Sequence, residues 1–263
     1  MQRHSSLIAF AVLASFCQAG FAQSSTFTTS SAGNWGPIVA PDSIAAGFGS
    51  SLTNQTYSSF SLPLTTDLGG VIVQVTDSSK TSAAASLYMA SAGQVNYLVP
   101  TGAAVGLGST VVTSRSGTVT NGTVLISNVA PAIFAANGNG QGPAAAEVFY
   151  YPAIGSSSYA YTFVGGASSY GTSPITLSPS TTQVFVVLYG TGIRHHSLNP
   201  VKATIGGTLV PVAYAGAVSS DPGLDQINLG PLPQSLAGTG RGDVPVVVTV
   251  DGAPANTVTV NIQ

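Results

Sequence analysis

SAGQVNYLVP (residues 91–100) and GLDQINLGPLP (residues 223–233) are two versions of one pattern. Each contains a glutamine, a β-branched residue, an asparagine and an apolar residue in succession, with a proline soon afterwards. Gln94 and Gln226 stand 132 positions apart. A pattern that recurs at this distance predicts one structural unit present twice in the chain.

Motifs on both sides of this pattern repeat in the same order. LGGVIVQV (68–75) corresponds to IGGTLVPV (205–212), FGSSL (48–52) to YGTGI (189–193), and 111–129 to 247–263. The offsets differ by a few residues, as loops of different length would produce. We therefore predict two β-sandwich modules, 38–131 and 132–263, each in the size range of immunoglobulin-like domains.

Short runs of alternating apolar residues predict strands. The valines at positions 71, 73 and 75 share one face, and so do Val258, Val260 and Ile262. The run 183–190 is more continuously apolar, as expected for a central strand, and Gly206-Gly207 predicts a two-residue hairpin turn. The 31 glycines and 16 prolines disfavour long helices. The predicted fold class is all-β, with two tandem immunoglobulin-like β-sandwich modules.

The first residues have the organisation of a secretory signal. Arg3 and His4 precede an apolar run at 7–16, and small residues around Ala22 suit cleavage after that position. The run is too short for a membrane span, which needs about 20 residues. We predict a signal peptide at 1–22, a flexible Ser/Thr/Gly-rich leader at 23–37, and a secreted or cell-surface protein without a transmembrane segment in its mature chain.

Charged residues and cysteine are scarce. Only 5% of the residues are charged and the formal net charge is −2, which argues against nucleic acid as a partner. Cys17, the only cysteine, lies in the predicted signal peptide, so the mature chain would have no disulfide. The bulky Phe16 before it disfavours lipid attachment.

Eight ordered motifs resemble a known family. They are APDSIAAGFGSSL, LPLTTDLGGVIVQV, ASLYMASAGQVNYLVP, APAIFAANGNGQGPAA, VFVVLYGTGI, ATIGGTLVPVAYAG, GLDQINLGPLP and GDVPVVVTVDGAPANTVTVNIQ. Over 38–263 the chain resembles the uncharacterised C-terminal domain of secreted proteins of Acidobacteria, especially Solibacter. At fold level it is also similar to the transcription-factor-type immunoglobulin-like (IPT/TIG) domains of surface receptors.

The resemblance implies an extracellular β-rich module with no established activity and no catalytic residues to carry over. Two features depart from the family. This sequence lacks the family's usual large N-terminal partner region, and a Tyr-rich segment stands where the family has a plainer stretch.

The Tyr-rich segment, about 147–171, is expected to form the opening strands of the second module with an inserted hairpin or loop. Clustered Tyr with Ser and Gly suits an adaptable contact surface or stacking on sugar rings. The alternative is that these rings only cover the edge of a sandwich. The candidate binding residues are Tyr150, Tyr151, Tyr159, Tyr161 and Tyr170.

The repeated amides Gln94, Asn96, Gln226 and Asn228 are predicted to be structural. Side-chain amides can bond backbone groups at a strand edge or turn, so two equivalent positions would serve the fold of both modules. A paired ligand site is the alternative.

No catalytic constellation or metal site is evident. Glu147 and the seven aspartates form no recognisable glycosidase pair, and no nucleophile elbow occurs. Three other motifs have structural explanations: a loop for His195-His196, turns for Asp221 and Asp225, and a connection for NGNGQG (137–142). Arg241-Gly242-Asp243 is read as a chance match to an integrin-type tripeptide. We predict no catalytic residues, no metal and no cofactor.

Together these features predict a secreted or cell-surface, non-enzymatic β-sandwich protein for adhesion, envelope scaffolding or protein–protein contact. The alternative is a carbohydrate-binding module that uses the Tyr-rich segment. The expected partner is an extracellular glycan or an envelope protein.

Overall fold

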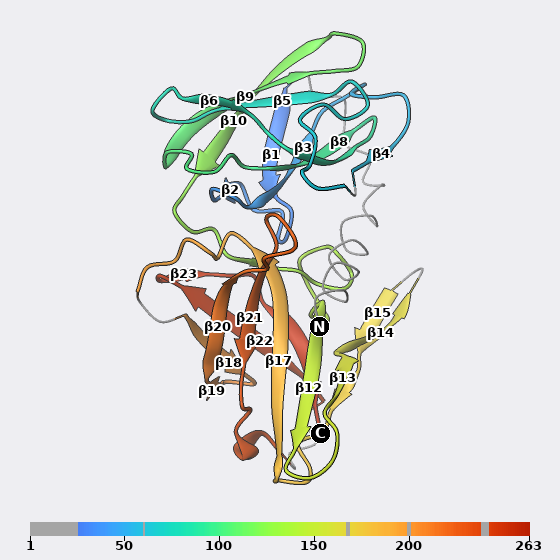
Figure 1. Ribbon diagram of the computed structural model, residues 1–263, viewed down its shortest axis with the longest axis vertical. Coiled ribbons are helices and arrows are strands. Elements are labelled where there is room, and N and C mark those ends of the chain that lie inside the picture. The colour runs from blue at the N-terminus through green and yellow to red at the C-terminus, as the bar shows by residue number, and fades with distance from the viewer. Residues whose placement is uncertain (1–25, 60, 167–168, 199–200, 238–241) are drawn as a thin grey trace. The chain divides into compact units, whose positions relative to one another are not determined.

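The computed structural model describes residues 26–59, 61–166, 169–198, 201–237 and 242–263 (Figure 1). The predicted signal peptide at 1–22 lies outside the described residues. Contacts divide the chain after Ala130, giving an N-terminal unit (26–130) and a C-terminal unit (131–263). The described residues form strands and one short 3-10 helix, η1 (Gln234–Leu236), and none of their helices is long and apolar enough to span a membrane. The all-β prediction is confirmed, whereas the immunoglobulin-like arrangement stays a prediction.

A single curled sheet of ten strands forms the N-terminal unit. Along the sheet the order is β4-β7-β8-β3-β1-β10-β9-β5-β6, and β2 also pairs with β10. The strands are β1 (Phe27–Ser31), β2 (Ile38–Val39), β3 (Ile44–Phe48), β4 (Tyr57–Ser58), β5 (Ile72–Thr76), β6 (Ser82–Ala84), β7 (Leu87–Ala90), β8 (Gln94–Leu98), β9 (Gly106–Thr113) and β10 (Val119–Ile126). Strand β1 joins the two halves because it pairs antiparallel with β3 and parallel with β10. Both halves contribute to one buried cluster, Val73 and Val112 from one and Val95 and Tyr97 from the other.

Strand β1 lies within the stretch predicted to be a flexible leader, so that prediction is wrong for residues 27–31. Phe27, Thr29 and Ser31 alternate inward and are buried. The hydroxyls of Thr29 and Tyr97 are hydrogen-bonded at 2.8 Å in the core. A strand of Ser and Thr can therefore be buried, because its inward hydroxyls find partners that the sequence does not reveal.

The C-terminal unit contains two six-stranded sheets and a separate hairpin. The first sheet has the order β13-β12-β17-β21-β20 with β11 on β17, and the second has the order β16-β24-β22-β18-β19 with β23 on β22. The strands of the first sheet are β11 (Ala132–Ile133), β12 (Ala146–Pro152), β13 (Ser158–Tyr161), β17 (Thr182–Thr191), β20 (Val212–Ala217) and β21 (Asp225–Leu229). Those of the second are β16 (Pro174–Ile175), β18 (Lys202–Ile205), β19 (Thr208–Val210), β22 (Gly242–Val250), β23 (Ala253–Pro254) and β24 (Val258–Ile262), and the hairpin joins β14 (Phe163–Gly166) to β15 (Ser169–Thr172).

Figure 1 shows β12, β17, β21 and β20 in one layer, with β22 and β18 behind them. Each sheet turns one face inward. Leu188 and Ile227 of the first sheet and Val246 and Val260 of the second are at most 1% exposed. As predicted, β17 is a central strand, and Val258, Val260 and Ile262 share a buried face.

Equivalent strands pair in the same way in the two units. The row β7-β8-β3-β1 corresponds to β20-β21-β17-β12, and the row β10-β9-β5-β6 corresponds to β24-β22-β18-β19. The register agrees as well. Gln94 lies opposite Phe48 and Gln226 opposite Tyr189.

The units differ at β1 and at its structural equivalent β12. Strand β1 has β3 on one side and β10 on the other, whereas β12 has β17 on one side and β13 on the other. The Tyr-rich segment supplies β13, which pairs with the edge of β12 that corresponds to the β10-facing edge of β1. In the C-terminal unit the short β16, not β12, pairs in parallel with the last strand, β24. The sheet that contains β12 and the sheet that contains β24 are therefore separate.

One sequence correspondence is wrong. Strand β5, which pairs with β9, follows Gly69-Gly70, but its structural equivalent β18, which pairs with β22, precedes Gly206-Gly207. The glycine pair at 206–207 does form the predicted hairpin turn, with φ of 56° and 80°. Any tight reversal needs such residues, so a glycine pair identifies a turn and not the strand beside it.

Candidate functional site

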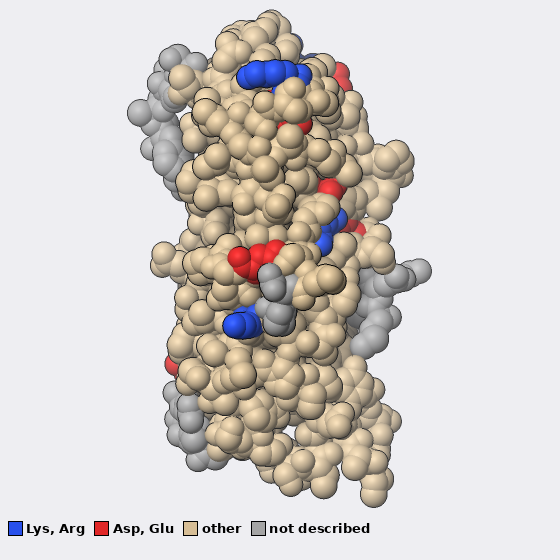
Figure 2. Space-filling model, turned by 90° about the vertical axis from the view of Figure 1, so that its left-hand side faces the viewer, with Lys and Arg blue, Asp and Glu red and all other residues tan. Residues whose placement is uncertain are grey.

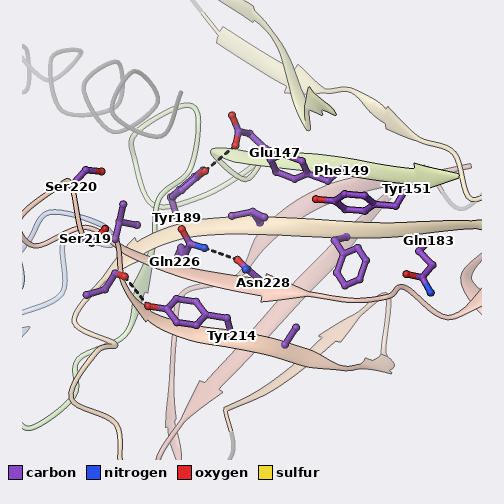
Figure 3. A pocket seen from close by; sticks show the side chains of 15 residues that line it. Glu147, Phe149, Tyr151, Gln183, Tyr189, Tyr214, Ser219, Ser220, Gln226 and Asn228 are labelled. Carbon is purple, nitrogen blue, oxygen red and sulfur yellow. Dashed lines mark hydrogen bonds between the residues drawn. The ribbon is translucent and has the colours of Figure 1, made fainter. Parts of the chain in front are cut away.

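The outer face of the sheet β13-β12-β17-β21-β20 holds a groove of about 760 Å³ (Figure 3). Side chains alternate along each strand, so those between the core residues point outward. Strand β12 contributes Glu147, Phe149 and Tyr151, and β17 contributes Gln183, Phe185, Val187 and Tyr189. Gln226 and Asn228 come from β21, and Tyr214 comes from β20.

Aromatic rings on this face hold one another in place. Tyr151 meets Phe185 edge to face, with ring centroids 5.7 Å apart and planes at 82°. Phe149 stacks on Tyr159 of β13 at 5.7 Å and 25°. Tyr151 and Tyr159 remain 37% and 45% exposed. The rings are therefore fixed before any ligand arrives and still present surface to solvent.

Polar side chains in the groove are tied by hydrogen bonds. Gln226 Nε2 donates to Asn228 Oδ1 at 2.9 Å, and the Tyr214 hydroxyl donates to the Ala217 carbonyl at 2.7 Å. The Tyr189 hydroxyl donates to Glu147 Oε2 at 2.9 Å. All three bonds are drawn in Figure 3.

The groove carries little charge. Of the described residues that line it, Glu147 alone is acidic and none is basic. The molecular face in Figure 2 likewise shows only scattered Lys, Arg, Asp and Glu among uncharged residues. Burial, then the nearby Glu147 carboxylate and Tyr159, raise the pKa of the Tyr161 hydroxyl, so that group stays neutral at physiological pH.

The five candidate tyrosines do not form one platform. Tyr151 lines the groove, and β13 places Tyr159 and Tyr161 beside it, opposite Phe149 and Glu147. Tyr170 lies farther along, because Phe163 packs between it and Tyr161 with both centroid distances at 5.4 Å. Tyr150 points to the other side of β12, where burial raises its pKa. Their binding role stays a prediction.

Sequence reasoning missed several residues of this face. Phe149 and Tyr151 alternate on one strand, as do Phe185 and Tyr189 with Val187 between them. This period-two pattern is visible in the sequence, but the run 183–190 was interpreted only as a central strand and its outward-facing rings were not considered as a site. Tyr214 carried no signal because a bulge interrupts the pairing of β20 with β21 before it.

The repeated amides form the same bond in both units. Gln94 Nε2 donates to Asn96 Oδ1 at 2.8 Å, matching the bond between Gln226 and Asn228. The amides thus bond to each other, where bonds to backbone groups were expected. Their surroundings differ, since Gln94 and Asn96 are 6% and 2% exposed whereas Gln226 and Asn228 are partly exposed in the groove.

The remaining candidates lie elsewhere. Asp225, expected in a turn, begins β21 and is buried on the side opposite the groove, where Arg194 Nε donates to it at 2.7 Å. Asp221 accepts a bond from the Ser220 hydroxyl. His196 lies near the Ser197 and Ala215 carbonyls. Within the described residues, no three His, Cys, Asp or Glu side chains gather in a way that could hold a metal ion.

No described residue of the Arg-Gly-Asp tripeptide or of the NGNGQG run lines the groove. Arg241 of the Arg-Gly-Asp tripeptide lies outside the described residues, and Asp243 accepts a bond from Asn261 Nδ2 at 2.9 Å. In the loop 137–142, Asn137 Oδ1 accepts a bond from the Tyr170 backbone at 2.8 Å and so ties that loop to the β14–β15 hairpin.

No protein-family model matches the chain, and no curated protein sequence matches it. The resemblance to the Acidobacteria domain therefore stays a prediction. Among solved structures, the chain is similar to SGBP-B, a surface glycan-binding protein of the Bacteroides ovatus mixed-linkage glucan utilization locus, solved with a mixed-linkage heptasaccharide. The identity is 15% and the TM-score 0.31, and the match covers 86% of this chain but only 43% of that one. This likeness assigns no family to the chain.

Proposed function

We propose that the protein is a non-catalytic, extracellular or cell-surface carbohydrate-binding protein whose C-terminal unit holds a glycan in the groove. The observation that carries this proposal is a groove that combines pre-positioned exposed rings with side-chain amides and almost no charge. Its two units are, on this proposal, two copies of one immunoglobulin-like β-sandwich module, of which the second carries the site.

The groove suits the chemistry of a sugar chain. A sugar ring has apolar C–H faces, which pack on aromatic rings, and hydroxyls, which amides can both donate to and accept from. From Gln183 to Tyr189 the groove follows six residue steps of β17, or about 20 Å at ~3.3 Å per step. That length accommodates several sugar rings in a row.

Comparison of the two units supports a specialised surface. Equivalent positions, defined by strand pairing, hold Ala32 and Phe149, Ile44 and Phe185, and Met89 and Tyr214. Small or aliphatic residues of the N-terminal unit are replaced by aromatic ones in each case. Maintaining one fold does not require these larger rings, so their gathering on the outer face of the C-terminal unit points to a ligand.

The same groove argues against glycoside hydrolysis. That reaction needs two carboxyl groups on either side of the bond that is cut. Glu147 is the one carboxylate among the described lining residues, and Asp225 on β21 is engaged by Arg194 on the opposite face. We therefore propose binding without catalysis.

Affinity electrophoresis of the exported form, residues 23–263, tests the proposal. The gels contain galactomannan, xyloglucan, mixed-linkage β-glucan or dextran as neutral polymers, and alginate as an anionic one. We expect retardation by at least one neutral polymer and none by alginate. Tyr151→Ala and Phe185→Ala should each weaken binding by tenfold or more, about 1.4 kcal/mol.

Two controls accompany these variants. Tyr151→Phe keeps the ring and should retain binding, and Leu209→Ala changes an exposed residue of the second sheet and should behave as the wild type. Failure of every neutral polymer to retard the wild type would contradict the proposal.

Contact with an envelope protein is the second candidate function. Ile38, Leu125 and Leu107 lie side by side on β2, β10 and β9, and each is more than 40% exposed. Apolar side chains gathered in this way favour protein contact. Retention on envelope fractions that Leu107→Asp abolishes and Tyr151→Ala leaves unchanged would favour this function over glycan binding.

A further inference from the structure

We propose that Gln226 and Asn228 determine specificity by recognising two adjacent hydroxyls of one sugar ring, while the equivalent Gln94 and Asn96 serve only the fold. The inference rests on the proposed glycan-binding function and specifies which side chains select the ligand.

The mutual bond of the pair determines which groups face a ligand. Gln226 Nε2 donates and Asn228 Oδ1 accepts at 2.9 Å. Outside that bond, the Gln226 amide still has a carbonyl oxygen that accepts and the Asn228 amide has an NH2 group that donates. The two residues are separated by one residue on β21 and project from the same face. A fixed acceptor beside a fixed donor matches two neighbouring hydroxyls, one donating and one accepting.

The tyrosines beside the amide pair use their hydroxyl protons in bonds within the protein. Gln226 lies opposite Tyr189 on β17, and Asn228 lies opposite Tyr214 on β20. The hydroxyl of Tyr189 donates to Glu147 and that of Tyr214 donates to the Ala217 carbonyl. Both hydroxyl protons are therefore used within the protein. Tyr189 is only 2% exposed, whereas Tyr214, at 42%, presents its ring to solvent. Figure 3 shows the amide pair between these two tyrosines.

The N-terminal unit supplies the internal comparison. Its pair has the same register and the same bond, at 2.8 Å, but is buried. A buried amide pair that is hydrogen-bonded contributes to stability and cannot reach a ligand. In the C-terminal unit the same bond and register occur in the groove, where Gln226 and Asn228 are partly exposed.

Substitution of Asn228 by Asp tests the proposal with little change in shape. The aspartate keeps the oxygen that accepts from Gln226 but has no NH2 group to donate. We expect Asn228→Asp and Gln226→Ala to weaken binding of the retarding neutral polymer by tenfold or more, with the midpoint of thermal unfolding almost unchanged. Gln94→Ala and Asn96→Ala should do the opposite, lowering that midpoint and leaving the affinity of the folded protein unchanged.

A chemically altered polymer adds a readout that a structural role would not change. Periodate cleaves the bond between carbons that carry adjacent hydroxyls, so the oxidised polymer loses the proposed feature. Oxidation should weaken binding by the wild type strongly and by Asn228→Asp much less.

The outcomes separate this inference from the proposed function. If Tyr151→Ala abolishes binding while Asn228→Asp and Gln226→Ala bind as the wild type does, glycan binding stands and the role of the pair is overturned. Equal effects of oxidation on wild type and Asn228→Asp also overturn it. If no neutral polymer binds the wild type, both proposals fail.

Discussion

Asp225 determines, as a single residue, how β17 ends. Its carboxylate is fully buried and accepts bonds from Ile193 N at 2.7 Å, Arg194 N at 3.2 Å and Arg194 Nε at 2.7 Å. Burial raises the pKa of Asp225, and the Arg194 guanidinium offsets part of that rise. The same carboxylate thus holds both the turn after β17 and the start of β21.

Asp225→Ala should strongly destabilise the C-terminal unit. Three donors, one of them charged, lose their acceptor, and removing one partner of a buried ion pair costs about 3 kcal/mol. Urea unfolding measures this loss. Asp221→Ala, which removes an acceptor of the Ser220 hydroxyl, should cost about 0.5 kcal/mol. Equal losses for the two variants would contradict the role assigned to Asp225.

At the scale of elements, what pairs with the second edge of β1 or β12 decides whether a unit has one sheet or two. Strand β1 bridges two halves of a sheet, whereas β13 covers the corresponding edge of β12. The N-terminal unit accordingly has one curled sheet, and the C-terminal unit has two separate six-stranded sheets. Strand β13 also places Tyr159 and Tyr161 next to the groove, so the same strand affects both the architecture and the candidate binding face.

The hairpin between β18 and β19 provides a test at this scale. Gly207 has φ of +80°, and a Cβ there would have no atom within 4 Å. Gly207→Ala should then cost only the backbone strain of the left-handed region, about 1 kcal/mol. Gly171→Ala is the matched control, because its Cβ also meets open space and its φ lies outside that region. Thermal unfolding of both variants measures the difference, and equal midpoints would contradict the strain argument.

For the whole molecule, each unit has its own buried core, and the groove belongs to the C-terminal unit alone. Strand pairing is the same in outline in both units, yet three positions that hold Ala32, Ile44 and Met89 in the N-terminal unit hold aromatic residues in the C-terminal unit. The same order of paired strands therefore occurs with two different sets of outward-facing side chains, of which the aromatic set forms the proposed binding surface.

Two glycine substitutions should separate the units. A Cβ at Gly47 would lie 1.9 Å from the Phe27 ring, and one at Gly190 would lie 2.4 Å from the Ala132 carbonyl oxygen. Each overpacked variant should lose about 1–3 kcal/mol in its own unit. In calorimetry, Gly47→Ala should lower the midpoint temperature of the N-terminal unit's transition, which a bound polymer does not shift. Gly190→Ala should lower the midpoint temperature of the C-terminal unit's transition, which a bound polymer raises. A single transition lowered equally by both variants would contradict independent units.

The pattern of β-branched residues determined the fold class and the repetition. Val258, Val260 and Ile262 alternate as a strand must, and Gln-x-Asn occurs in the same strand register in both units. These features depend on neighbours a few residues away, so the sequence shows them directly. The leader prediction failed at 27–31 because the inward hydroxyl of Thr29 is satisfied by Tyr97, 68 positions later.

The sequence by itself therefore determined that the chain is all-β, that its motifs recur, and where two-residue turns such as Gly206-Gly207 occur. Only the tertiary structure decided that Phe149, Phe185, Tyr214 and Asn228 share one groove while Tyr150 leaves it. The physical reason is that a groove on a sheet is assembled from alternate residues of several strands, and their lateral order and register come from long-range hydrogen bonds. Local alternation predicts that a side chain points outward, but strand pairing determines which other side chains it meets.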